Sequence, residues 1–263
     1  MYAILVDVTR CTGCERCVSA CLDINDLDHQ RAADDRLVSP DGLSANRLLT
    51  IDKVESGRFA RKSCMHCVDP TCVSACLVGG LTKSKEGPVV YDATKCIGCR
   101  YCMLACPFHI PRYEWDRTLP LVKKCDMCMD RLQEGQRPAC VEACPSDVLL
   151  FGERDRILKE AHNRIRTNPD RYDQHVWGED EFGGTCILYV SDVDLGELGW
   201  TELMTAGIPS LTIPLIEKTP FIGGGVAVGL LAVNWIIRRR MRLAAEQSSE
   251  SGSCDERKSG GIG

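Results

Sequence analysis

The 263-residue chain lacks the motifs that mark most catalytic sites: we find no glycine-rich phosphate loop, no nucleophile elbow and no paired-carboxylate motif. A basic surplus is also missing. The segment from residue 238 onward carries six basic and four acidic residues, so the remainder has a formal net charge of −7 within an overall −5. Such an acidic domain is not expected to bind nucleic acid. The chain therefore points away from common hydrolases, nucleotide-dependent enzymes and nucleic-acid-binding proteins.

Cysteine is the residue that the chain has in excess. Eighteen are present, and sixteen of them fall into four closely spaced groups. The groups are Cys11-x2-Cys14-x2-Cys17-x3-Cys21, Cys64-x2-Cys67-x4-Cys72-x3-Cys76, Cys96-x2-Cys99-x2-Cys102-x3-Cys106 and Cys125-x2-Cys128-x11-Cys140-x3-Cys144. Sixteen thiolates supply four ligands to each of four [4Fe–4S] clusters.

The spacing within a group has a physical reason. A Cys-x2-Cys-x2-Cys loop curls around one cluster and supplies three ligands, whereas the fourth cysteine serves the other cluster of a pair. We expect the fourth cysteine to start a helix that points away from the loop. The bacterial ferredoxin run ends in Cys-Pro, and Cys106-Pro107 and Cys144-Pro145 match it.

Two other uses of cysteine compete with iron–sulfur binding. Structural zinc sites also use Cys-x2-Cys pairs, although they seldom add a third and fourth cysteine at these spacings. Disulfide frameworks are typical of short secreted chains with a higher cysteine content. Cys186 and Cys254 fit no group; we expect Cys186 to be a small buried residue in a strand and Cys254 to be a free thiol. His66, between two cysteines, is a candidate hydrogen-bond donor to a cluster sulfur.

The chain also contains an internal repeat. Residues Asp7–Cys21 align with Asp92–Cys106, and eight of the fifteen positions are identical. Each copy follows a short apolar segment, at residues 2–6 and 88–91, that predicts a strand. Gly13 and Gly98 recur between ligands, where we expect a close approach of the backbone to the cluster and a positive φ. The repeat predicts two ferredoxin-like modules related by a pseudo-twofold axis, in the α+β class.

The remaining soluble segments predict a linker and a cap. Residues 23–60 are polar and charged, with a turn at Pro40-Asp41-Gly42. Residues 152–167 read as a helix with Leu158, Ala161 and Ile165 on one face, and residues 185–190 as a strand. This segment either caps the apolar back of the modules or contacts a partner subunit; the sequence does not separate these alternatives.

One segment near the C-terminus predicts a membrane-spanning helix. Thr219–Ile237 is nineteen residues without a charge and would span ~28 Å as a helix. Trp235 lies near its end, four arginines follow between residues 238 and 242, and Gly225 and Gly229 form a weak G-x-x-x-G pair. A buried core helix is the alternative, but no further apolar sequence follows that could surround it.

The arginines also predict the orientation. By the positive-inside rule they place the C-terminal tail in the cytoplasm, so the cysteine-rich domain of a single-pass inner-membrane protein would lie in the periplasm. The sequence shows no signal peptide at its start, and we expect either its prior removal or export of a folded domain on a partner. We predict four regions: a double ferredoxin-like domain (1–151), the cap (152–210), the membrane helix with its basic flank (211–242) and a disordered tail (243–263).

The four cysteine groups, the strand that Gly183-Gly184-Thr185 begins and the C-terminal helix together resemble the four-cluster iron–sulfur (beta) subunits of membrane-bound respiratory oxidoreductases. Formate dehydrogenase beta subunits and hydrogenase-2 type subunits are the most similar in layout. The resemblance implies partners: a catalytic molybdopterin or nickel–iron subunit and a membrane cytochrome b or other quinone-reactive subunit. It also implies that the module built from the second and third groups faces the membrane. Some relatives replace the second cysteine of the third group with tryptophan; this chain keeps Cys99, so we expect four cubane clusters.

The exchange of the fourth cysteine, with the pairing of first and last groups that the family shows, predicts the ligand sets. They are Cys11, Cys14, Cys17 and Cys144; Cys125, Cys128, Cys140 and Cys21; Cys64, Cys67, Cys72 and Cys106; and Cys96, Cys99, Cys102 and Cys76. The expected function is transfer of single electrons between a catalytic subunit and a membrane subunit, without catalysis by the chain itself. The alternatives are a membrane-anchored ferredoxin that docks transiently with several partners, and a zinc-binding scaffold.

Overall fold

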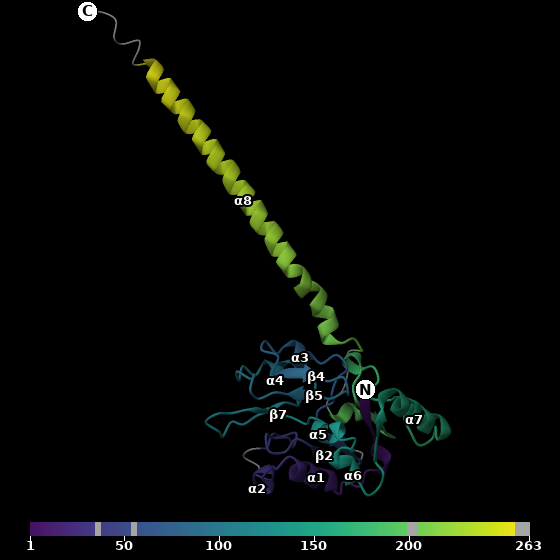
Figure 1. The fold of residues 1–263 in the computed structure, drawn as a ribbon. Coiled ribbons are helices and arrows are strands. Elements are labelled where there is room, and N and C mark those ends of the chain that lie inside the picture. The colour runs from purple at the N-terminus through teal and green to yellow at the C-terminus, as the bar shows by residue number, and fades with distance from the viewer. Residues whose placement is uncertain (35–37, 54–56, 199–204, 256–263) are drawn as a thin grey trace, which may run out of the picture. The chain divides into compact units, whose positions relative to one another are not determined.

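The computed structural model describes residues 1–34, 38–53, 57–198 and 205–255 (Figure 1). The chain divides into two compact units, Met1–Leu211 and Thr212–Gly263. The first unit contains all four cysteine groups, and its short helices and short strands agree with the predicted mixed class.

A three-stranded sheet forms the centre of the first unit. Strand β1 (Tyr2–Asp7) pairs antiparallel with β8 (Leu149–Glu153) and parallel with β9 (Ile187–Val190). The side chains of residues 3–6 and 187–190 are buried, because this sheet is covered on both faces. Strand β1 leads into the first cysteine group and β8 follows the fourth, so their pairing brings the first and last groups together.

The second and third groups have a smaller framework of the same kind. Strand β4 (Leu81–Lys83) pairs antiparallel with β5 (Val89–Tyr91), and helix α3 (Thr71–Ser74) contacts α4 (Tyr101–Ala105). Strands β6 (Arg112–Tyr113) and β7 (Val122–Lys123), each two residues long, pair antiparallel beside them. A separate small apolar core, which includes Leu81, Val89 and Val122, lies under this framework.

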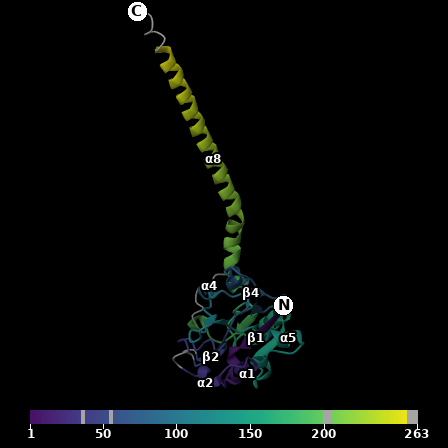
Figure 2. The ribbon, with the colours of Figure 1, turned by 60° about the vertical axis from the view of Figure 1, so that its left-hand side comes forward.

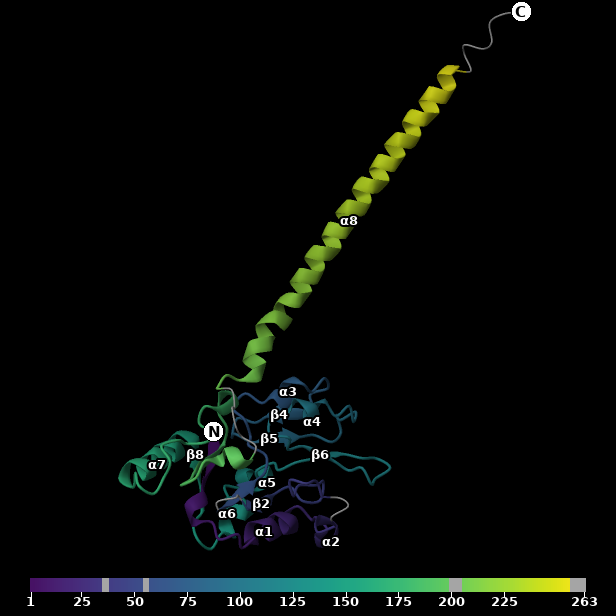
Figure 3. The ribbon, with the colours of Figure 1, turned by 180° about the vertical axis from the view of Figure 1, so that it is seen from behind.

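The helices of the first and fourth groups mirror this arrangement. Helix α1 (Arg16–Ile24) contacts α6 (Ala139–Glu142), as α4 contacts α3. Figures 1, 2 and 3 show α1 at one end of the first unit and α4 and β4 at the other. The repeat in the sequence therefore corresponds to two groups of matching elements; α5 (Met129–Gln133) follows the first half of the fourth group.

The segment between the first two groups is more structured than a polar linker. It contains α2 (His29–Ala32) and the hairpin of β2 (Thr50–Lys53) and β3 (Phe59–Lys62). The predicted turn at residues 40–42 is present, and Gly42 has φ +74°. Leu43 and Leu49 are buried in the main core. The segment therefore closes one side of the first module, which is the module built from the first and fourth cysteine groups.

The predicted cap is a helix, α7 (Arg154–Thr167). Its buried face consists of Ile157, Ala161 and Ile165, and Leu158 is only half-buried. The predicted face of Leu158, Ala161 and Ile165 therefore packs against the main core, with Leu158 at its half-buried edge and Ile157 buried beside it. Arg154 fastens the start of the helix by donating hydrogen bonds to the carbonyl oxygens of Thr185 (2.8 Å) and Glu179 (3.0 Å). Short 3₁₀ turns at Val8–Arg10, Glu181–Gly183 and Leu195–Leu198 complete the unit.

Helix α8 (Ile208–Asp255) contains the predicted apolar run. Within the described residues it is the one helix that is long and apolar enough to cross a membrane; the candidate span is Ile208–Ala244, and an 18-residue window in it has a mean hydropathy of 1.8. Its large apolar side chains from Phe221 to Ile237 are exposed, which a buried core helix would not allow. The helix continues beyond residue 243, where the sequence predicts disorder, because Ala244-Ala-Glu-Gln247 are good helix formers. Residues 256–263 lie outside the described part.

Candidate functional site

The loops of the first and third groups are shaped by left-handed backbone. Gly13 and Gly98 have φ of +70° and +71°, as predicted, and Glu15 and Arg100 have φ of +55° and +62°. A Cβ added to Gly13 would lie 2.7 Å from the ring of Phe59, so only glycine fits there without movement. Successive left-handed residues turn the chain tightly enough to direct several cysteines of one loop inward.

The helices follow these loops at a different place from the prediction. Helix α1 begins at Arg16, and α4 begins at Tyr101, so the third cysteine of each group already lies inside a helix. The prediction that the fourth cysteine starts the helix was wrong: Cys21 lies in the last part of α1, and Cys106 directly follows α4. Cysteines four positions apart on a helix share a face one turn apart, so the third and fourth cysteines reach neighbouring spaces.

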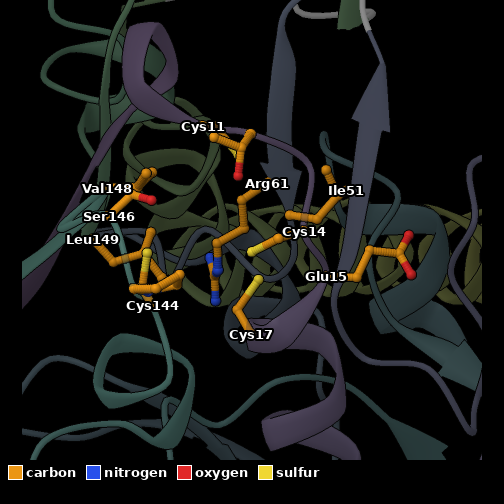
Figure 4. Close-up of a pocket in the computed structure, with 12 residues that line it drawn as sticks. Cys11, Cys14, Glu15, Cys17, Ile51, Arg61, Cys144, Ser146, Val148 and Leu149 are labelled. Carbon is orange, nitrogen blue, oxygen red and sulfur yellow. The ribbon is translucent and has the colours of Figure 1, made fainter.

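Three pockets are each lined by four cysteines. The first is lined by Cys11, Cys14, Cys17 and Cys144, the second by Cys21, Cys125, Cys128 and Cys140, and the third by Cys76, Cys96, Cys99 and Cys102. Figure 4 shows Cys14, Cys17 and Cys144 around the common space of the first pocket.

The remaining four cysteines also lie together. Burial raises the pKa of the Cys67 thiol well above its ordinary value, and the adjacent Cys64, Cys106 and Cys72 raise this pKa further. The pKa of the Cys72 thiol is raised to about 12, first by burial and then by the same neighbours, Cys64 and Cys106. Cys102 also acts on Cys72, which places this set beside the third pocket. Each of the four sets thus combines three cysteines of one group with the last cysteine of another.

Backbone N–H groups donate to several of these sulfurs. Such donors stabilise the thiolate form, which is the form that binds metal. The pairs are Gly80 N to Cys76 Sγ (3.1 Å), Met127 N to Cys125 Sγ (3.3 Å), Gly98 N to Cys96 Sγ (3.4 Å) and Ile110 N to Cys106 Sγ (3.5 Å).

The donor sets fit a cluster better than a single ion. Tetrahedral zinc holds four thiolates at about 2.3 Å from one point. Across residues 1–34, 38–53, 57–198 and 205–255, no three His, Cys, Asp or Glu side chains lie close enough together to bind one metal ion. A four-iron cluster, with one thiolate on each iron, needs the wider spacing of sulfurs around a shared pocket.

Buried cations lie between the cysteine sets, and no sequence pattern singled them out. Arg61 lines both the first and the second pocket, and Figure 4 shows its side chain among the first set of thiols. Lys124 is buried beside Cys125 and donates to the carbonyl oxygens of Cys125 (2.9 Å) and Val89. The one available signal was nearness in sequence: Arg61 lies three residues before Cys64, and Lys124 directly precedes Cys125.

The other residues marked by the sequence have mixed outcomes. Cys186 is fully buried, as predicted, next to β9. His66 is buried, and its Nδ1 accepts a hydrogen bond from the N–H of Val89 (3.0 Å), so Nε2 carries the ring proton. Burial and the nearby Lys124 and Lys83 hold the pKa of His66 well below its ordinary value. The side chain of Cys254 lies outside the described part of the structure.

Comparison with known families agrees with the cysteine sets. Two family models, both described as 4Fe-4S dicluster domains, match residues 56–154 and 10–79. Together they cover all four cysteine groups and more than half of the chain.

Individual relatives extend the likeness beyond the cysteines. The chain is 33% identical to the hydrogenase-2 operon protein HybA of Escherichia coli O157:H7, over 90% of this chain and 84% of the relative. It is 35% identical to the iron–sulfur subunit of the nitrate-inducible formate dehydrogenase of Escherichia coli K12, over 72% and 67%. It is 37% identical to one of the polypeptides of the anaerobic dimethyl sulfoxide reductase of the same strain, over 60% and 77%. The chain therefore belongs to the family of four-cluster iron–sulfur subunits of respiratory oxidoreductases, and its cofactors are [4Fe–4S] clusters.

Proposed function

We propose that this chain relays single electrons through four [4Fe–4S] clusters between an extracytoplasmic catalytic subunit and a quinone-reactive membrane subunit. The catalytic partner would be a molybdopterin or nickel–iron subunit, by analogy with the formate dehydrogenase and hydrogenase-2 relatives. The membrane partner would be a cytochrome b or another quinone-reactive protein.

The observation that carries this proposal is the grouping of sixteen thiols into four sets of four. We assign one cluster to each set: Cys11, Cys14, Cys17 and Cys144; Cys21, Cys125, Cys128 and Cys140; Cys64, Cys67, Cys72 and Cys106; Cys76, Cys96, Cys99 and Cys102. Each set shares a cysteine group with its neighbour, so the sets form two adjacent pairs. When bound, the clusters supply one-electron redox centres, which no side chain of this protein provides.

The protein's own contribution is to hold the thiols close, shielded and oriented. In the first group, helix α1 places Cys17 and Cys21 one turn apart, which keeps the two sets that they enter adjacent. Burial of Cys21, Cys64, Cys72, Cys102, Cys106, Cys125 and Cys140 keeps water from these ligands. Backbone N–H donors and buried cations favour the negative charge that electrons add.

An apolar surface near the third pocket supports docking of a partner there. Leu77, Ile97, Tyr101 and Leu104 are exposed, and Leu104 is 81% accessible. Ile97 also lines the pocket of Cys76, Cys96, Cys99 and Cys102. An electron could leave at this end with little protein between the thiols and the partner.

Helix α8 supports membrane anchoring, and the arginines at residues 238–240 and 242 favour a cytoplasmic C-terminus with the cysteine-rich unit in the periplasm. The region bounds predicted from the sequence stay a proposal, since the double module and the cap belong to one compact unit, Met1–Leu211.

The proposal is tested on the complex isolated under mild detergent without oxygen. We expect the chain to copurify stably with a catalytic and a membrane subunit, and substrate oxidation to reduce all its clusters. A chain that purifies alone, and that any of several redox proteins reduces equally well, would instead be a transiently docking membrane ferredoxin. A colourless protein rich in zinc would refute both.

A further inference from the structure

The position of Arg61 is determined by the hairpin that precedes the second cysteine group. Arg61 lies on β3 and pairs with Ile51 on β2. Its carbonyl oxygen accepts a hydrogen bond from the hydroxyl of Tyr189 on β9 (2.8 Å). Tyr189 is fully buried and Ile51 is half-buried, and Arg61 itself is only 2% exposed. The side chain therefore has little freedom to leave its site.

The guanidinium group lies between two sets of thiols. Arg61 lines the pocket of Cys11, Cys14, Cys17 and Cys144 and also that of Cys21, Cys125, Cys128 and Cys140. One terminal nitrogen is 3.8 Å from the sulfur of Cys140. Nε and the other terminal nitrogen, Nη1, are buried and have no hydrogen-bond partner among the residues that the structure describes. Among the ion pairs of the described residues, none includes Arg61.

A buried guanidinium without a carboxylate requires another source of negative charge. Leaving such a charge unpaired in a protein interior costs several kcal/mol, so charged groups are rarely buried alone. Besides Glu15 and Asp126, the groups that line these two pockets with Arg61 and can carry negative charge are the cysteines of the two sets.

We propose that Arg61 is a shared positive charge that raises the reduction potentials of the two clusters in the first module and stabilises both in their reduced form. This inference rests on the proposed function, because it requires clusters in both sets. Each added electron is a new negative charge, and the fixed guanidinium attracts it at either site. At an effective dielectric constant of about 20, a unit charge within about 10 Å changes the reduction equilibrium roughly tenfold.

The same hairpin offers a matched control. Lys62, the next residue on β3, points to the opposite face of the strand and pairs with Asp41 (3.5 Å) and Asp52 (4.0 Å). It carries the same charge as Arg61 but lines neither of the two pockets. The cluster of Cys76, Cys96, Cys99 and Cys102 provides an internal control, since Arg61 lines no part of the third pocket.

The experiment is a redox titration of the full chain, purified without oxygen and monitored by electron paramagnetic resonance. In Arg61→Gln, the midpoint potentials of the two clusters beside Arg61 should fall by about 59 mV, which is a tenfold change for one electron, and that of the cluster in the third pocket should stay unchanged. Arg61→Lys should restore the two potentials to near wild type. Lys62→Gln should leave all four at their wild-type values.

The outcomes separate this inference from the proposed function. A wild-type chain without four one-electron centres would refute the proposed function, and the inference with it. Four centres whose potentials are the same in wild type and Arg61→Gln would overturn the inference alone. If Arg61→Gln loses iron, Arg61→Lys distinguishes charge from shape. Four clusters with wild-type potentials in Arg61→Lys would support the role of the charge. Loss of iron in Arg61→Lys as well would overturn the inference, because it would show that the shape of arginine holds the site.

Discussion

Replacing Asp7 with asparagine should loosen the attachment of the cap to the first cysteine loop. Asp7 ends β1, four residues before Cys11, and its side chain is fully buried. One carboxylate oxygen accepts hydrogen bonds from the Arg164 guanidinium and the Tyr172 hydroxyl, both at 2.9 Å. The other accepts one from the Thr9 hydroxyl at 2.6 Å. Asp7→Asn removes the charge and turns one acceptor into a donor that faces other donors.

The size of the effect follows from what remains of the network. Removing one partner of a buried ion pair costs about 3–5 kcal/mol of unfolding free energy. Arg164 also pairs with Glu160 at 2.9 Å, so its charge is not left alone and the lower end, about 3 kcal/mol, applies. If this interaction is absent from the transition state for unfolding, the domain unfolds faster by up to about a hundredfold.

The repeat in the chain supplies the control. Asp92 occupies the same place before Cys96, but it is exposed, and its partners are the backbone N–H (3.0 Å) and hydroxyl (2.5 Å) of Thr94 and the ammonium of Lys95 (3.0 Å). These hydrogen bonds lower the pKa of Asp92 to about 2. Asp92→Asn should therefore change stability little, because water can replace what is lost.

The assay is the half-life of the clusters' visible absorbance in the purified chain, held at one elevated temperature without oxygen. We expect Asp7→Asn to shorten this half-life by about tenfold or more relative to wild type. Asp92→Asn should stay close to wild type. Equal half-lives for the two variants would refute the reasoning, because they would show that the buried network does not hold the domain together.

The remaining predictions concern the loops, the ligands and the helix. Cys99→Ser should disturb one cluster and leave three, so iron analysis should fall from about sixteen to about twelve per chain; an unchanged content would contradict the assignment. Gly13→Ala should lower the denaturant midpoint more than Gly135→Ala does. Both glycines have a positive φ, but only a Cβ at Gly13 would lie within 3 Å of a ring, so the extra loss of unfolding free energy is about 1–3 kcal/mol. Truncation before Thr219 should leave four clusters and dye-linked activity of the complex but abolish quinone-linked activity; full quinone-linked turnover would show that the helix is dispensable. Cys254 should resist impermeant thiol reagents added to spheroplasts, and labelling from outside would reverse the orientation.

Local chemistry made much of this molecule predictable. The cysteine groups are recognisable because the ligands of one loop must lie within a few residues of each other. The strand at the N-terminus and helix α7 were also foreseeable, because an apolar run and a helical period of apolar residues are local patterns. The structure brings together the thiols of each predicted set, and their assignment as ligands stays a prediction until metal is measured.

Tertiary features were beyond reach of the sequence. Arg61 and Asp7 look like ordinary charged residues, because their burial depends on segments more than a hundred residues away, around Tyr189 and Arg164. The deeper burial of Ile157 than of Leu158 on α7 could not be foreseen, since both residues fit a helical period almost equally well. The position of the fourth cysteine at the end of a helix reflects where left-handed loop residues allow the helix to begin, which spacing alone does not specify.

Metal analysis of the anaerobically purified chain tests the central claim most directly. Four clusters with four irons each predict about sixteen iron per chain, together with a brown colour. An iron content near eight, or a content dominated by zinc, would contradict the four-cluster account of this protein.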